Sequence, residues 1–162
     1  MTTSRPDLKF LLAHPAHLIA FGFGSGLAPR APGTVGTLLG LPLFWLIAAA
    51  APDRPNQIIL LLAAFLLGVW ACGRTGRALG VADHGGMVWD EIVAFALVLS
   101  FTPAGWTWMA LAFALFRLFD ILKPWPIRMA DRNLKNGFGV MFDDLLAAGF
   151  AMAVLKGLQW LV

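Results

Sequence analysis

Five apolar segments alternate with short polar stretches along this chain of 162 residues. They are residues 37–51, 58–73, 87–101, 106–122 and 145–162, each somewhat shorter than the roughly 20 residues of a full membrane span. Hydrophobic residues make up 59% of the sequence and charged residues only 13%, which is unlike an average soluble domain. The pattern predicts an all-α fold, a polytopic membrane helical bundle of about four to five transmembrane helices, with residues 1–162 as a single domain.

The segment before them, residues 14–27, is too polar and too rich in glycine to span a membrane. It predicts a short N-terminal helix that lies at the membrane interface and ends near Gly22. His14, Pro15 and His17 interrupt the apolar stretch that precedes this helix, so we expect no cleaved signal peptide. With no further His or Cys nearby to complete a zinc site, the two histidines are expected to have a structural role.

The basic residues predict how the bundle is oriented, because cytoplasmic loops of membrane proteins carry an excess of Lys and Arg. In the five-span topology, Arg54 falls on one side of the membrane. The other side carries Arg5, Lys9, Arg30, Arg74, Arg77, Lys123, Arg128, Arg132 and Lys135. We therefore expect this basic side, which includes the N-terminus, to face the cytoplasm.

The acidic residues are placed very unevenly, since all but Asp7 and Asp53 lie between Asp83 and Asp144. A carboxylate at the centre of a membrane helix costs roughly 2.5–3.5 kcal/mol on insertion scales, so several of them are expected only around a positive partner. Five fall at the predicted cytoplasmic ends of the last three segments: Asp90, Glu91, Asp120, Asp143 and Asp144. We expect these five to be metal ligands and catalytic residues around one divalent cation. Helix capping by the two acidic pairs is the alternative.

The chemistry of these ligands indicates which ion they would bind. Ligand sets made only of oxygen suit magnesium, with manganese as the alternative, whereas zinc favours His and Cys. Asp83 and His84 precede the first acidic pair and could support the ligands or carry protons, although an ordinary loop histidine fits equally well. Arg117 lies three residues before Asp120 on one helix, so it either neutralises that carboxylate or binds an anionic substrate.

Two other segments could bind a phosphate group. Residues 22–34 combine bare glycine amides with Ser25, Arg30 and Thr34. Their spacing is not that of a Rossmann or P-loop motif, and a flexible connector is the alternative. Lys123 and Arg128 lie in a proline-rich exit from the fourth segment, where they could bind the same phosphate or extend to the lipid head groups.

The charge pattern argues against several other classes of protein. The net charge of +3 is small and the basic residues form no long stripe, so no nucleic-acid partner is expected. Cys72, the single cysteine, lies in an apolar segment and is expected to be inert. A small membrane ion or metabolite transporter is the alternative function, but it would need ionisable groups near the midplane. A non-catalytic scaffold would not need so many carboxylates.

Four motifs carry a resemblance to a known family. They are residues 22–34 with Gly36; Asp83-His84-Gly85 with Val88-Trp89-Asp90-Glu91; Phe116-Arg117 with Asp120 and Lys123-Pro124-Trp125-Pro126-Ile127; and residues 137–141 with Asp143-Asp144. In this order they resemble the phosphatidylglycerophosphatase A family of bacteria, although Ala94 stands where a glycine is expected. The resemblance implies hydrolysis of phosphatidylglycerophosphate to phosphatidylglycerol, with a divalent ion, in the bacterial inner membrane. It leaves the oligomeric state unknown.

Together these features predict metal-assisted hydrolysis of a phosphomonoester at the cytoplasmic face. The cation would offset the charge of the phosphoryl oxygens and lower the pKa of water, with one carboxylate left as general base. Arg30, Arg117 and Lys123 are the main candidates for binding the substrate phosphate. The acyl chains of the lipid would stay in the bilayer.

Overall fold

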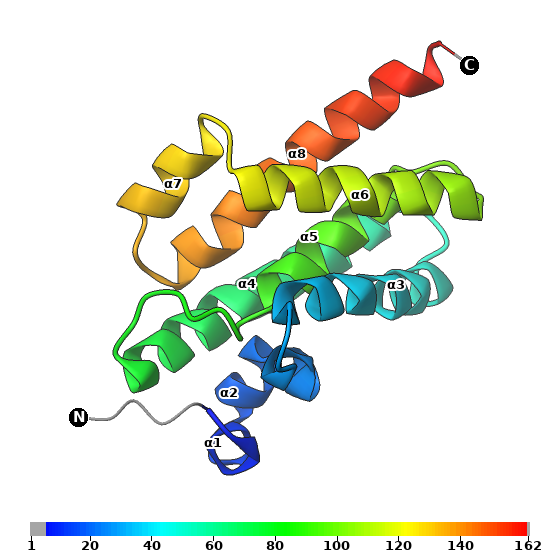
Figure 1. Ribbon diagram of the computed structural model, residues 1–162. Helices are drawn as coiled ribbons and strands as arrows, with labels where there is room; N and C mark the ends of the chain where they lie inside the picture. The colour runs from blue at the N-terminus through cyan, green and yellow to red at the C-terminus, as the bar shows by residue number, and fades with distance from the viewer. Residues whose placement is uncertain (1–5, 162) are drawn as a thin grey trace.

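The structure, a computed structural model, describes residues 6–161, and these residues form helices and connecting segments without a strand (Figure 1). The helices are α1 (Leu8–Leu12), α2 (Pro15–Ala20), the 3-10 helix η1 (Gly22–Leu27), α3 (Pro32–Ala50), α4 (Arg54–Leu79), α5 (Trp89–Ser100), α6 (Trp106–Leu122), α7 (Ile127–Asn133) and α8 (Gly137–Gln159). The all-α prediction is confirmed. Arg5 and Val162, which entered the predicted topology, lie outside the described residues.

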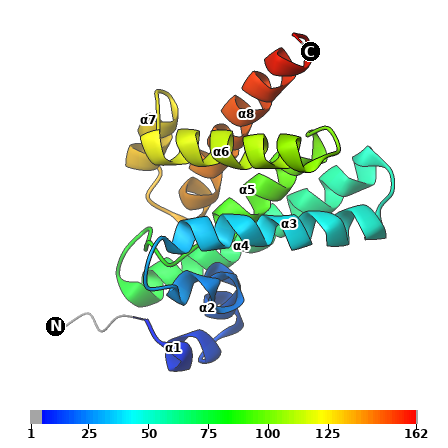
Figure 2. The same cartoon turned by 45° about the vertical axis from the view of Figure 1, so that its right-hand side comes forward.

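The bundle is built around α5, which contacts α3, α4, α6 and α8 (Figure 2). Its side chains are apolar around most of the helix, and Phe95, Ala96 and Val98 are almost completely buried. By contrast, α4 presents Ile59, Leu62 and Leu66 to the surroundings, with 55–61% of each exposed. An apolar outer face of this kind is typical of a helix that contacts lipid.

Within residues 6–161, three helices are long and apolar enough to cross a membrane: α3, α4 and α8. The helix α5 has only 12 residues, or roughly 18 Å, against a hydrocarbon core of about 30 Å. Its charged first turn is buried between the longer helices. The structure therefore describes a membrane protein with three candidate spans, and the count of four to five remains a prediction.

The helix boundaries differ from the predicted segments in two places that matter for the site. The segment predicted to begin at residue 145 was placed wrongly, because α8 already begins at Gly137, where Asn136 Oδ1 accepts a hydrogen bond from the Gly139 amide at 2.9 Å. Asp143 and Asp144 therefore lie in the second turn of α8 and not at its N-terminus. The loop implied between the predicted segments 58–73 and 87–101 was also too long. The helix α4 continues to Leu79 and ends at Gly80, whose φ is +72°.

The N-terminal segment forms short helices, of which α2 packs on α4, and the short helix predicted within residues 14–27 is present as α2. His14 caps α2 through Nδ1, which accepts from the Ala16 amide at 3.0 Å, and the other side of its ring lies against Arg74, with 3.1 Å between Arg74 Nε and His14 Nε2. His17 stacks on Phe10, with 4.2 Å between the ring centroids. These contacts give both histidines the structural role that the sequence indicated.

Candidate active site

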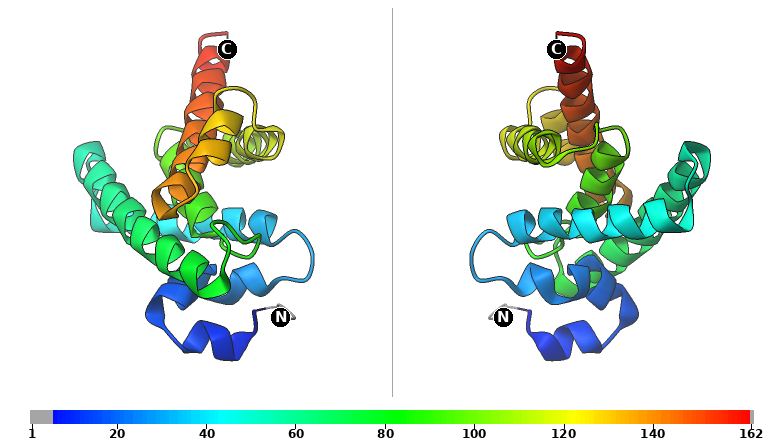
Figure 3. Two further views of the ribbon diagram at one scale, coloured as in Figure 1. Left: turned by 90° about the vertical axis from the view of Figure 1, so that its left-hand side faces the viewer. Right: turned by 90° about the vertical axis from the view of Figure 1, so that its right-hand side faces the viewer.

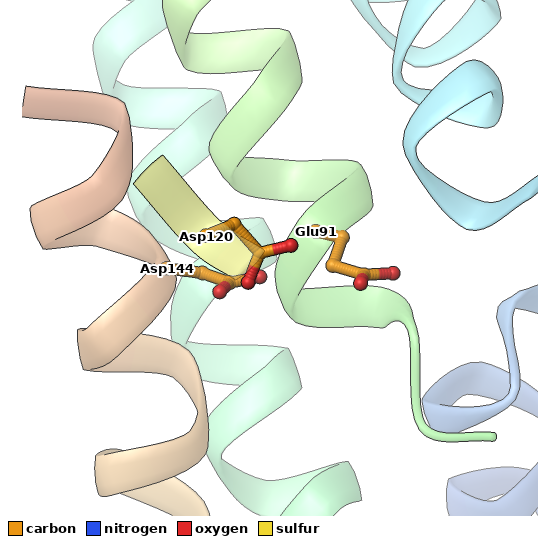
Figure 4. Close-up of side chains that lie close together, drawn as sticks. All are labelled: Glu91, Asp120 and Asp144. Atoms are coloured by element: carbon orange, nitrogen blue, oxygen red, sulfur yellow. The ribbon is translucent and has the colours of Figure 1, made fainter. Parts of the chain in front are cut away.

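Carboxylates from three helices meet at one point between α5, α6 and α8. Glu91, Asp120 and Asp144 each place an oxygen within 4.8 Å of the others, and we call these three residues the carboxylate cluster (Figure 4). Asp120 and Asp144 are 8% and 4% exposed, and Glu91 is only a little more open. The predicted convergence of distant acidic residues is therefore present for three of the five.

Arg117 is the basic partner of this cluster. Its Nη1 donates hydrogen bonds to Asp120 Oδ2 at 2.5 Å and to Glu91 Oε1 at 2.8 Å. A third, longer bond of 3.3 Å runs to the hydroxyl of Thr37 on α3. Arg117 thus holds carboxylates of two helices in place, which matches the neutralising role rather than that of a cation free for substrate.

The cluster still has more negative charge than the protein neutralises. Three carboxylates and one guanidinium leave a formal charge of −2 in a buried volume. Glu91 Oε2 and Asp144 Oδ2 are buried with no hydrogen-bond partner among the described residues. Buried polar atoms without a hydrogen-bond partner are rare because they cost free energy. These two oxygens therefore indicate that a bound group is needed to stabilise them. A divalent cation fits both the charge deficit and the oxygen-only donors.

The N-terminus of α3 lies directly against this cluster. A Cβ at Gly33 would lie 2.9 Å from Glu91 Cδ, and one at Gly36 would lie 3.1 Å from Glu91 Oε2. Only glycine allows so close an approach of the backbone. The positive end of the α3 dipole stabilises the Glu91 carboxylate, typically by 0.3–1 kcal/mol at a helix N-terminus. This is how the glycine-rich segment reaches the site.

Asp143 faces a different group from its neighbour Asp144, because successive helical residues point about 100° apart. Lys123 Nζ, at the end of α6, donates to Asp143 Oδ2 at 2.5 Å and to Asp131 Oδ1 at 3.0 Å. Burial alone would lower the pKa of Lys123, but these two hydrogen bonds outweigh it and raise that pKa. Lys123 therefore stays protonated and is already paired with carboxylates.

Asp131 was not among the predicted site residues. It lies on α7 between Arg128, Arg132 and Lys135, in a stretch where an acidic residue looks like an ordinary surface charge. Its contact with Lys123 comes from α7 packing against α8, and no helix was predicted there. The sequence offered no signal that could have singled it out.

Asp90 is also buried, but on another side of α5, whereas Asp83 is exposed in the loop that precedes this helix. Asp90 is 7% exposed, and its Oδ1 accepts from the Glu91 amide at 3.0 Å while the side chain lines an apolar cavity between α4, α5 and α8. Partial removal of the Asp83 carboxyl from water raises its pKa, and the charge of Asp131 adds to this, against the opposing effect of Lys123. His84 is bonded within its own loop, where Nδ1 accepts from the Gly86 amide at 3.0 Å.

The remaining predicted phosphate ligands make no contact with the carboxylate cluster in the structure. The Ser25 hydroxyl donates to the Gly22 carbonyl at 2.9 Å, which holds η1 together. Arg30 is exposed beside the start of α3, and Thr34 is half-buried in its first turn. Arg128 is exposed on α7, with Nη2 donating to the Leu122 carbonyl at 3.3 Å.

A comparison with known proteins now identifies the family. The model of the family described as phosphatidylglycerophosphatase A matches residues 18–159. The chain belongs to the phosphatidylglycerophosphatase A family. The matched range contains every residue of the carboxylate cluster and its basic partners, so the resemblance seen in the four motifs is confirmed.

Two relatives align with this chain over most of their own length. The chain is 47% identical to the phosphatidylglycerophosphatase A of Haemophilus influenzae, over 99% of this chain and 98% of the relative. It is 41% identical to the phosphatidylglycerophosphatase A of Escherichia coli, over 91% of this chain and 85% of the relative. None of the solved structures gives a significant match. The family establishes a membrane-associated lipid phosphatase, which is a hydrolase.

Proposed function

We propose that this protein removes the terminal phosphate of phosphatidylglycerophosphate, releasing phosphatidylglycerol and inorganic phosphate. The relatives that match almost the whole chain are named for this activity. The observation that carries the chemistry is the buried carboxylate cluster with two oxygens that lack a partner. Anionic ligands of this kind can hold a cation against a phosphate group, which carboxylates alone would repel. The transporter alternative is not favoured, because the charged groups gather at one end of the bundle.

In this proposal Glu91, Asp120 and Asp144 hold one divalent cation, which is magnesium, with manganese as the alternative. When bound, the cation offsets the charge on the phosphoryl oxygens and makes water more acidic. Asp90 and Asp143 lie outside the cluster, and their part as further ligands or as the group that takes a proton from water stays a prediction. The head group of the substrate can reach the cluster without passing deep between the helices, since the cluster lies near the helix ends.

The protein's own cations prepare the site for an anion. Arg117 fixes the orientation of Glu91 and Asp120 through its hydrogen bonds. Lys123 stays protonated between Asp143 and Asp131 and could turn toward a phosphate by exchanging one carboxylate for it. Arg30 is exposed beside the start of α3, whose N-terminus lies against the cluster, and in this proposal it binds the substrate phosphate.

The site belongs, in this proposal, to the cytoplasmic face of the bacterial inner membrane. The ends of α4 and α6, the start of α8 and all of α7 gather at one end of the bundle (Figure 1). That end carries the Lys and Arg residues of the described chain apart from Arg54 and Lys156. The excess of basic residues follows the rule for cytoplasmic loops.

Chelation tests both the reaction and its metal dependence. Purified protein in detergent is expected to release phosphate from phosphatidylglycerophosphate, to lose nearly all activity in EDTA, and to regain it when excess magnesium is added. Absence of phosphate release under every metal condition would refute the proposed function. Full activity in EDTA would refute only the metal centre and leave the reaction in place.

Replacing Thr37 with Val tests how far Arg117 depends on its third partner. The hydroxyl is fully buried, accepts from Arg117 and donates to the Gly33 carbonyl at 2.8 Å. Its loss should lower phosphatase activity roughly 10-fold, the scale of one hydrogen bond to a charged group. Thr102→Val is the matched control, because Thr102 also donates to the carbonyl four residues before it but lies at the other end of the bundle. Equal activity of the two variants would contradict this role.

A further inference from the structure

An apolar slot runs along α5 between α4 and α8, beside the carboxylate cluster. It has a volume of about 200 Å³ and is lined by Leu61, Phe65, Val93, Leu97, Met141 and Leu145, with Asp90 as its single charged residue. We call this cavity the slot. None of the roles derived above uses it, and Asp90 is the one residue that it shares with the predicted catalytic set.

The slot arises from the way α4 and α8 cross. Gly73 and Gly137 let the two backbones touch, since a Cβ at Gly137 would lie 2.7 Å from Gly73 Cα. One turn further along, Gly68 contacts Trp89, whose Nε1 donates to the Ala64 carbonyl at 3.0 Å. Beyond this point the two helices diverge (Figure 3). The slot occupies the angle between them, closed at the crossing and open toward the lipid.

The shape of the slot limits what can fill it. From Asp90 to Leu97 it follows seven residues of α5, or roughly 10 Å. A protein cavity of about 150 Å³ holds one benzene molecule, so about 200 Å³ accommodates a slender apolar group. An α-helix is about 10 Å wide with its side chains and is too thick. A single hydrocarbon chain has the required width and polarity.

The position of the slot relates it to the reaction centre. Asp90 forms its end near the crossing, and the next residue on α5 is Glu91 of the cluster. Leu145 lines the slot on α8, and the residue before it is Asp144 of the cluster. A molecule with a phosphate at the cluster and a hydrocarbon tail could therefore reach both sites at once.

From this geometry we infer that the slot binds one acyl chain of the phospholipid substrate, which rests on the proposed function. The chain gains little hydrophobic energy on moving from lipid into the slot, because both surroundings are apolar. Its contribution is to position the head group, and a misplacement of 1 Å at a reaction centre can cost about 100-fold in rate. The slot thereby favours lipid phosphates over the same head group without acyl chains.

Filling the slot tests this inference. Leu97→Trp should lower kcat/KM for diacylated phosphatidylglycerophosphate at least about 10-fold and leave that for the deacylated head group unchanged. Leu66→Trp is the matched control, because Leu66 lies on the lipid-facing side of α4 with 59% exposed. A Leu97→Trp variant that keeps the wild-type ratio of the two kcat/KM values would overturn the inference.

Direct labelling tests the slot without relying on turnover. The probe is a phospholipid with a diazirine in one acyl chain, placed in a phosphatidylcholine nanodisc. It is expected to label Phe65 and Leu97 of the wild-type protein. The Leu97→Trp variant should lose the label at Phe65 but keep it at Leu66. If the wild type released no phosphate yet showed this labelling, the proposed function would fail and the slot would stand. Labelling confined to Leu66 would overturn the inference that the slot binds an acyl chain. A fall in oligomeric mass caused by Leu97→Trp would also overturn it, because the slot would then bind a second copy of the chain.

Discussion

Replacing Asp144 with Asn is expected to lower phosphatase activity by roughly 10³-fold, the scale on which a key electrostatic group at a reaction centre acts. Asp144 is 4% exposed, and its Oδ2 has no hydrogen-bond partner among the described residues. The amide keeps the shape of the side chain but removes one of three negative charges around the proposed cation. Phosphate release should be measured at several magnesium concentrations, since a weakened ligand set should also need more magnesium to reach half of its maximal rate.

Two substitutions of the same kind serve as controls for Asp144→Asn. Asp53 is exposed and caps α4 far from the cluster, so Asp53→Asn should leave activity within twofold of wild type. Asp143→Asn is the sharper comparison, because Asp143 is the adjacent residue but pairs with Lys123 instead of the cluster. It should reduce activity less than Asp144→Asn, and a change in its magnesium requirement would show that Asp143 is a further ligand. An Asp144→Asn variant with near wild-type turnover would refute the metal centre.

The general architecture could be predicted from the apolar segments and the placement of charge. The range 106–122 coincides with α6, and the idea that carboxylates from separate helix ends share one volume holds for Glu91, Asp120 and Asp144. Both predictions rest on the cost of leaving charge beside lipid, which acts on any chain of this composition. Such a constraint can be read from a sequence because it does not depend on the details of packing.

The orientation of individual side chains could not be predicted in the same way. Gly137 and Gly139 lie inside the first turn of α8, where they allow close contacts with Gly73 and Leu134. Tertiary packing here outweighs the low helix propensity of glycine. Once the helix begins at Gly137, the two acidic residues point to different partners. The sequence alone treated them as one pair.

A second limit concerns segments whose helicity comes from packing. No helix was predicted in the connection after Pro126, yet it contains α7, which carries Asp131 to Lys123. The helix α5 is likewise too short to span a membrane, and its central place follows from its contacts with the longer helices around it. Local periodicity in the sequence indicates neither feature. The contacts of Lys123 with Asp131 and Asp143 could therefore be recognised only in the fold.

Replacing Arg117 with Met is expected to destabilise the protein by about 3–5 kcal/mol, because removing one partner of a buried ion pair leaves the other charge uncompensated. Arg117 is 14% exposed and bonds both Glu91 and Asp120. In its absence the three carboxylates of the cluster carry a formal charge of −3. The variant should therefore depend on a divalent cation for folding. Thermal unfolding in detergent should show a larger loss of Tm on adding EDTA than the wild type shows.

The matched control for this effect is Arg128→Met, because Arg128 is exposed at the same end of the bundle and donates to the backbone carbonyl of Leu122. Its Tm should change little, and EDTA should affect it as it affects the wild type. If Arg117→Met unfolded at the wild-type temperature in EDTA, the cluster would not be charged as described. A normal Tm in magnesium together with a large fall in EDTA would instead show that the cation and Arg117 neutralise the same carboxylates, which is the physical basis of the proposed metal centre.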